Sequence, residues 1–189
     1  MIETRKIRKF FPAIKSGRIV SNNAASTQVP LQLLDLLKKL IAQYDNVHRG
    51  QSQASMLTTE KFEASYDTIA QFINAPSRKN IILYRNATEA INSVMYSLMT
   101  EFRDGDNVVT TFMEHNSNYV PWYGLCKEIL AKFGINVECR LAKFDKETGE
   151  LDLIHLKSLV DEKTKLICCT GASNFLGTKN PIEKIREIA

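Results

Sequence analysis

The second half of the sequence alternates between short apolar runs and longer segments with helical periodicity, separated by polar turns. Strands are expected at 81–84, 108–112, 135–141 and 165–170. Helices are expected at 88–102, 119–133 and 152–160, with a last one starting at Pro181. Consecutive strands that are joined through a helix pair in parallel by right-handed crossovers. The alternation therefore predicts an α/β fold, a mostly parallel sheet with helices on both faces.

The first part of the chain has a different pattern. Two helices are expected at 31–44 and 58–72, joined by a polar segment, and no Gly/Ser-rich linker follows them. We expect residues 1–75 to form an N-terminal arm with helices, and residues 76–189 to form an α/β large domain. The last helix stops at Ala189 with no capping residue and no closing strand. The large domain is therefore expected to be incomplete, truncated at Ala189.

Composition excludes several classes of protein. Hydrophobic residues make up 44% and charged residues 24% of the chain, which is typical of a folded globular protein. A formal net charge of +4 is too small to indicate nucleic-acid binding without a basic stripe that carries aromatic residues. No apolar run approaches the roughly 18 residues of a membrane span. We expect no nucleic-acid partner, no membrane partner and a cytoplasmic location, although the basic, acid-poor N-terminus leaves an organellar presequence open.

The four cysteines and three histidines do not predict a metal site. The cysteines form no Cys-x-x-Cys pair, and the histidines have no ligand spacing. We expect all four thiols to be reduced and buried, because free cysteine usually packs as a small hydrophobe. The chain also contains no Walker A loop, no Gly-x-Gly-x-x-Gly motif and no Gly-x-Ser-x-Gly motif.

Polar loops follow three of the expected strands, at 85–89, 113–118 and 171–178. In open α/β sheets, ligands bind beyond the carboxyl ends of the strands. Thr88 begins a helix and could hold a phosphate, or it could serve with Asn86 as an ordinary N-cap. His115 could act as a general acid or base, or it could be a hydrogen-bonded structural residue. The side-chain amide of Asn174 can both donate and accept hydrogen bonds, although its segment alone is typical of a turn.

Five segments, taken in order, identify a family. They are 21–26 (SNNAAS), 47–50 (VHRG), 87–92 (ATEAIN), 114–118 (EHNSN) followed by Pro121 and Trp122, and 173–178 (SNFLGT). Together they resemble the class V aminotransferase family of pyridoxal-phosphate enzymes, of fold type I, and within it the cysteine desulfurase and selenocysteine lyase group. The resemblance covers roughly residues 19 to 188.

The resemblance implies a site for pyridoxal 5′-phosphate (PLP). Ala87 and Thr88 would bind the cofactor phosphate, and His115 would stack on the pyridine ring and act as the catalytic histidine. Asn174 would bind the phenolic oxygen of the cofactor. Ala24 and Ala25 would border the substrate. Two positions depart from the pattern, because family members often have a second threonine where Ala87 stands, and many desulfurases have two consecutive histidines where this chain has His115 and Asn116.

The implied reaction is a cysteine desulfurase reaction, from cysteine to alanine plus an enzyme-bound persulfide. Related enzymes are homodimers and pass the sulfur to an acceptor protein. The alternatives are another PLP reaction of the family (lyase, epimerase or aminotransferase) or a non-catalytic half-domain. The family's Schiff-base lysine lies beyond the position that matches Ala189. We therefore expect an enzyme as the full-length protein and no activity from these 189 residues alone.

Overall fold

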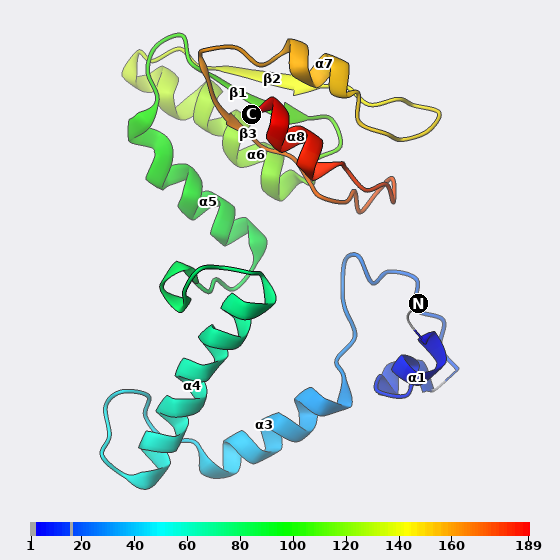
Figure 1. Cartoon of the computed structure of the whole chain (residues 1–189), viewed down its shortest axis with the longest axis vertical. Helices are drawn as coiled ribbons and strands as arrows, with labels where there is room; N and C mark the ends of the chain where they lie inside the picture. Colours follow the sequence, from blue (N-terminus) through cyan, green and yellow to red (C-terminus); the bar gives the residue numbers. More distant parts are fainter. Residues whose placement is uncertain (1–2, 16) are drawn as a thin grey trace. The chain divides into compact units, whose positions relative to one another are not determined.

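The computed structural model describes residues 3–15 and 17–189, in two compact units, Met1–Ile82 and Leu83–Ala189 (Figure 1). The helices of the first unit are α1 (Thr4–Arg8), α2 (Pro12–Lys15), α3 (Leu31–Gln43), α4 (Gln53–Phe72) and the 3₁₀ turn η1 (Arg78–Asn80). Both long helices lie close to the predicted ranges. No helix among the described residues is long and apolar enough to cross a membrane.

The loop between α3 and α4 is held by hydrogen bonds to the start of α4. His48 adopts a positive φ of 60°, and its backbone N–H donates to Thr59 Oγ1 at 3.0 Å. Its Nε2 atom lies 2.9 Å from Glu63 Oε1. A Cβ atom on Gly50 would lie only 2.5 Å from Ser55 Oγ, so this position requires glycine. These contacts tie the loop to α4.

The second unit contains a three-stranded parallel sheet in the order β2-β1-β3. Its strands are β1 (Asn107–Thr111), β2 (Glu138–Ala142) and β3 (Thr164–Ile167). Its helices are α5 (Ala87–Leu98), α6 (Asn116–Gly124), α7 (Leu153–Ser158) and α8 (Ile182–Ile188), with the 3₁₀ turn η2 (Met99–Glu101) after α5. After α6 the chain continues through a π-helical turn, η3 (Leu125–Ile129), and a 3₁₀ turn, η4 (Leu130–Phe133), to Gly134, whose left-handed φ of 73° ends the helical segment.

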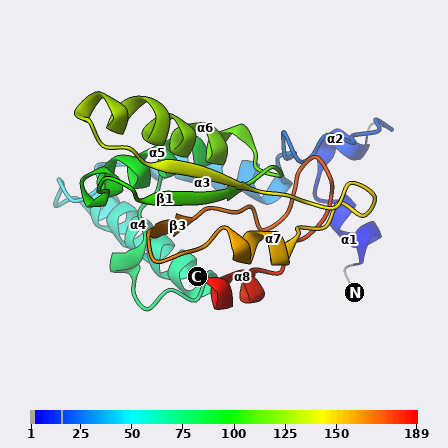
Figure 2. The ribbon, with the colours of Figure 1, turned by 90° about the horizontal axis from the view of Figure 1, so that it is seen from above.

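Helices cover both faces of this sheet, as predicted (Figure 2). Every residue of β1 is buried, and alternate residues of β1 face opposite cores. Val108 packs in the core that includes Met95 of α5 and Trp122 of α6. Val109 packs in the second core, with Leu156 of α7 and Ile185 of α8. The central strand is therefore covered by α5 and α6 on one side and by α7 and α8 on the other.

The prediction of a strand at 81–84 is wrong. These residues belong to no strand or helix in the structure, and although Ile81 is buried, Ile82 and Leu83 are 72% and 52% exposed. An apolar run becomes a strand only when another strand pairs with its backbone N–H and C=O groups. The run 81–84 has no such partner among the described residues. The other three predicted strands are present, each with slightly shifted ends.

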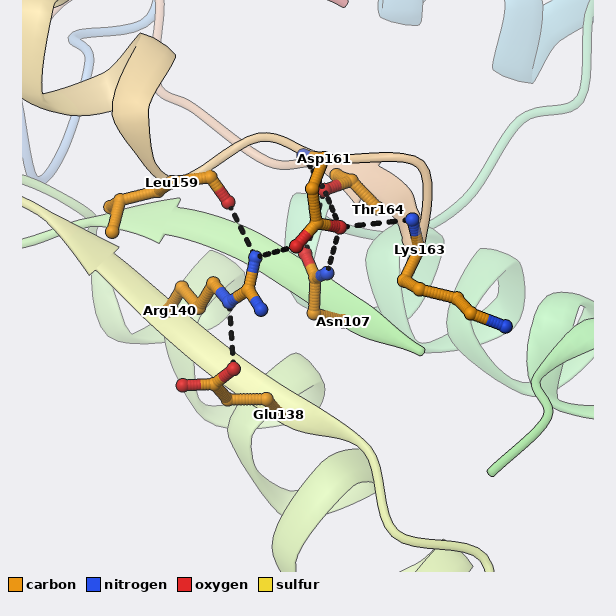
Figure 3. A network of polar contacts seen from close by, with 7 residues as sticks. All are labelled: Asn107, Glu138, Arg140, Leu159, Asp161, Lys163 and Thr164. Atoms are coloured by element: carbon orange, nitrogen blue, oxygen red, sulfur yellow. Dashed lines mark hydrogen bonds and ion pairs between the residues drawn. The ribbon is translucent and has the colours of Figure 1, made fainter. Parts of the chain in front are cut away.

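A polar network joins the three strands near their amino ends (Figure 3). Arg140 on β2 donates from Nε to Glu138 Oε2 at 2.7 Å and from Nη1 to Asp161 Oδ2 at 2.6 Å. Asn107 on β1 donates to Asp161 Oδ1 at 2.9 Å and accepts from the Thr164 hydroxyl of β3 at 2.8 Å. Hydrogen bonds from Arg140 and then Asn107 lower the pKa of the Asp161 carboxyl from 3.8 to about 2. At this edge of the sheet the polar side chains bind one another.

Candidate functional site

The first turn of α5 leaves hydrogen-bond donors free. The side chain of Asn86, the N-cap residue, accepts from Glu89 N at 2.9 Å, and its carbonyl accepts from Ala90 N at 3.2 Å. Within residues 3–15 and 17–189, no acceptor is found for the amides of Ala87 and Thr88 or for the Thr88 hydroxyl. Three donors without an acceptor at the positive end of a 12-residue helix are the kind of arrangement that can bind an anion.

Glu89 lies in the same turn, but its charge is already paired. Its carboxylate accepts from the backbone N and the Nε of Arg85 at 3.0 and 3.1 Å, and from Nη2 at 3.0 Å. Hydrogen bonds from the Arg85 side chain, then its backbone, lower the pKa of Glu89. The acidic side chain is therefore turned back toward Arg85 and does not occupy the donors of Thr88.

His115 lies between the end of β1 and the start of α6, where it is the N-cap residue. Its Nδ1 atom accepts from Ser117 N at 3.1 Å and lies 2.8 Å from Ser117 Oγ. Acceptance at Nδ1 places the proton of the neutral ring on Nε2, an assignment that follows from the hydrogen-bond network. The exposed side chain thus has a defined orientation and a free Nε2–H group.

Asn174 lies at the tip of a tight loop that follows β3. An antiparallel bridge joins Ala172 to Lys179 at the base of the loop, and Ser173 Oγ accepts from Leu176 N at 3.0 Å. The side chains of Asn174 and Phe175 are exposed, with Phe175 at 88%. Backbone pairing therefore defines the base of the loop, and the Asn174 amide lies at its exposed tip.

Two cavities are lined by the candidate residues, and His115 lines both. A cavity of about 480 Å³ is lined by Thr88, His115 and Ser117, among others. A second, of about 380 Å³, is lined by Glu114, His115 and Asn174, among others. Thr88 and Asn174 therefore each share a cavity with the same histidine, and His115 and Asn174 lie in the loops that follow β1 and β3.

The remaining candidates have simpler surroundings. Ala24 and Ala25 lie in a turn of the first unit, where Ala25 N donates to Asn22 O at 3.2 Å, and their role as substrate neighbours stays a prediction. All four cysteines are free, as expected, but only Cys126 and Cys168 are buried, so the expected burial of Cys139 and Cys169 is wrong. Burial raises the pKa of Cys168, and a hydrogen bond to Cys139 followed by burial raises that of Cys126. Cys126 and Cys168 are therefore held as thiols.

Sequence reasoning assigned no role to Glu114, although it lies directly before His115. Its Oε1 atom accepts from the Thr111 hydroxyl at 2.7 Å and from Thr170 N at 2.9 Å. The signal available in the sequence was an acidic residue immediately after a buried strand. Its partner Thr170, however, lies 56 residues away in the chain.

Known proteins match nearly the whole chain. The family described as Aminotransferase class-V matches residues 19–189. A protein of Synechocystis sp. named "Probable cysteine desulfurase" is 42% identical over 97% of this chain and 44% of its own length. A Streptomyces coelicolor protein of the same name is 36% identical over 98% of this chain and 46% of its own length. The chain thus spans less than half the length of these relatives.

Solved structures agree with this assignment. A cysteine desulfurase from Thermococcus onnurineus superposes with a TM-score of 0.88 at 28% identity, over 100% of this chain and 45% of that one. A cysteine desulfurase from Escherichia coli shares the fold with a TM-score of 0.82 at 23% identity, over 100% of this chain and 46% of that one. With the fold, the position of the site and a family match that covers most of its residues in agreement, the chain belongs to the class V aminotransferase family.

Proposed function

We propose that this chain forms the phosphate- and ring-binding part of a PLP-dependent enzyme that converts cysteine to alanine. The sulfur would pass to an enzyme thiol as a persulfide. The proposal is supported by relatives named cysteine desulfurase, which the chain matches along 97% and 98% of its length. The observation that carries it is the position of His115, which lines one cavity with Thr88 and another with Asn174.

The phosphate end of the site fits a dianion. Two free amides and one free hydroxyl, from Ala87 and Thr88, face no acceptor within the described residues. Charge-assisted hydrogen bonds from backbone N–H groups, together with the helix dipole, stabilise such an anion. Alanine at position 87 removes one hydroxyl from the set but leaves its amide, so the backbone would contribute most of the phosphate contacts.

The ring end of the site needs a flat surface and a polar anchor. The imidazole of His115 offers an aromatic face, and its orientation is fixed through Ser117. Asn174 would donate to the phenolic oxygen from its exposed loop tip. When bound, PLP supplies an electron sink for carbanions. The part of His115 in that chemistry would be to hold the ring in place and to carry a proton at Nε2.

Three of the four cysteines, Cys126, Cys168 and Cys169, are not suited to take the sulfur, because the transfer requires an accessible thiolate. Cys126 and Cys168 are buried with raised pKa values, and burial also raises the pKa of Cys169. The persulfide thiol would therefore be none of these three. We further propose cysteine as the substrate, a homodimer, a sulfur-acceptor protein as partner, and a cytoplasmic location.

Pyridoxine 5′-phosphate tests the binding proposal, because it has the ring and phosphate of PLP but no aldehyde to react with surface lysines. We expect the 189-residue chain to bind it about ten-fold or more tightly than pyridoxine, which lacks the phosphate. Equilibrium dialysis gives both affinities, and ³¹P NMR reports the phosphate directly. Equal affinity for the two ligands, or binding of neither, would overturn the proposed site.

A further inference from the structure

The carboxylate of Glu114 connects three elements that surround His115. Oε1 accepts from Thr111 of β1 and from the backbone N–H of Thr170, which follows β3, at 2.7 and 2.9 Å. Oε2 accepts from Asn118 Nδ2 in the first turn of α6 at 2.7 Å. One side chain therefore fixes the ends of two strands and the start of one helix, next to the histidine in sequence.

The direction of these hydrogen bonds is imposed from both ends. The indole of Trp122 can only donate, and it donates to Asn118 Oδ1 at 3.2 Å. Asn118 must therefore turn its NH₂ group toward Glu114. At the other end, the backbone N–H of Thr170 is also only a donor, and the Thr111 hydroxyl accepts from Met113 N at 3.1 Å, which directs its own proton to Glu114.

Position 114 therefore requires acceptors at both of its oxygen positions, which an ionised carboxylate provides and a glutamine does not. We infer that Glu114 is the positioning residue of the site and that the directed chain from Trp122 through Asn118 to Glu114 sets the place and orientation of His115. The expected effect on ligand binding rests on the proposed function. The hydrogen-bond directions concern only side chains of this protein and do not depend on it.

Exchanging the side chains of residues 114 and 118 tests the direction of these hydrogen bonds. In Glu114→Gln, the new NH₂ group faces the NH₂ group of Asn118, and turning Asn118 over would only move the conflict to Trp122. In Asn118→Asp, two carboxylates face each other across a contact that is 2.7 Å long in the parent. In the double variant the introduced glutamine donates to the introduced aspartate, whose second oxygen accepts from Trp122, so every donor again has an acceptor.

Two readouts are independent of cofactor chemistry. Trp122 is the single tryptophan of the chain, so its indole N–H gives one NMR signal that needs no assignment. The ring signals of His115 are identified by their loss in His115→Ala. We expect both sets to shift in each single variant and to return toward the parental positions in the double variant. Glu150→Gln, at an exposed glutamate, is the matched control and should leave them unchanged.

Ligand binding gives the functional readout. Affinity for pyridoxine 5′-phosphate should fall about ten-fold or more in Glu114→Gln, as for the loss of a hydrogen bond to a charged group, and should recover in the double variant. For Asn118→Asp, the helix dipole alone predicts no such loss of affinity, because an acid in the first turn of α6 would stabilise the helix.

The inference is overturned if Glu114→Gln leaves the indole and His115 signals at their parental positions. It is also overturned if the double variant is no closer to the parent than the single variants are. Absence of pyridoxine 5′-phosphate binding in the parent would instead refute the proposed function, while the two NMR signals would still decide the role of Glu114.

Discussion

The two edges of the sheet in the second unit contain similar polar residues but use them differently. At the amino edge, Asn107, Arg140 and Asp161 are bound to one another, and most of their polar atoms are satisfied within the network (Figure 3). At the carboxyl edge, the donors of Thr88 and the exposed amide of Asn174 have no protein partner among the described residues. Glu114 pairs with Thr111, Thr170 and Asn118 at this end as well, so only the groups that remain without a partner are free to bind a ligand.

The largest effect is expected at the amino edge, in Arg140→Ala. The side chain is only 22% exposed and binds two carboxylates. Its loss should lower the free energy of unfolding by about 2 kcal/mol and leave affinity for pyridoxine 5′-phosphate unchanged. Urea unfolding and equilibrium dialysis measure the two quantities. The control, Arg186→Ala, removes an exposed ion pair with Glu183 and should have almost no effect. Weaker ligand binding in Arg140→Ala would show that the amino ends of the strands also affect the ligand site, contrary to the comparison.

His115→Ala should have the opposite signature. Loss of an aromatic stacking surface should weaken binding of pyridoxine 5′-phosphate by about ten-fold. Because His115 also caps α6, the free energy of unfolding should fall by up to about 1 kcal/mol. His155→Ala is the control, since the ring of His155 instead accepts from Lys143 N at 3.1 Å and lines neither cavity. If both variants bound the ligand equally, His115 would be a structural residue.

Thr88→Val isolates a single hydroxyl. The shape of the side chain is kept and the backbone amide remains, so affinity for pyridoxine 5′-phosphate should fall by about five-fold, the effect of one ordinary hydrogen bond. Affinity for pyridoxine, which has no phosphate, should not change. The exposed Thr100 provides the control variant Thr100→Val. A parental affinity in Thr88→Val would exclude this hydroxyl from the phosphate site.

The smallest effect is a pH dependence at the amino edge. The pKa of Asp161 is about 2 in the folded protein, against 3.8 as its ordinary value. The ionised carboxylate therefore stabilises the folded state fully at pH values above its ordinary pKa of 3.8. This contribution is lost as the pH falls through about 2. Asp161→Asn should flatten the fall in melting temperature over this acidic range. Asp35→Asn, on the exposed surface of α3, should leave the slope as in the parent.

Local patterns were enough to predict most elements of the fold. The runs at 108–112, 135–141 and 165–170 became β1, β2 and β3 because each finds a neighbouring strand. The run 81–84 is equally apolar but has no neighbouring strand among the residues that the structure describes, and the sequence contains no local sign of that difference. Pairing depends on chain segments that are distant in sequence, so periodicity predicts where a strand can form and not whether its partner is present.

The candidate site divides in the same way. The rule that ligands bind beyond the carboxyl ends of strands pointed to the loops that contain His115 and Asn174, whereas Thr88 follows a run that forms no strand. The roles of all three residues came from the family resemblance. The cavities that His115 lines with each of the other two come from the folding of the loops in three dimensions. The roles of these residues stay predictions until the variants are measured.

The sequence by itself determined the α/β class, the family and the residues that begin each polar loop, because these depend on periodicity and on short motifs. Only the tertiary structure decided how Glu114 is used. Its carboxylate binds Thr111 and Asn118 nearby but also Thr170, 56 residues further along the chain. Parallel strands bring such residues together through crossovers, and the direction of each hydrogen bond depends on donors that become neighbours only in the folded chain.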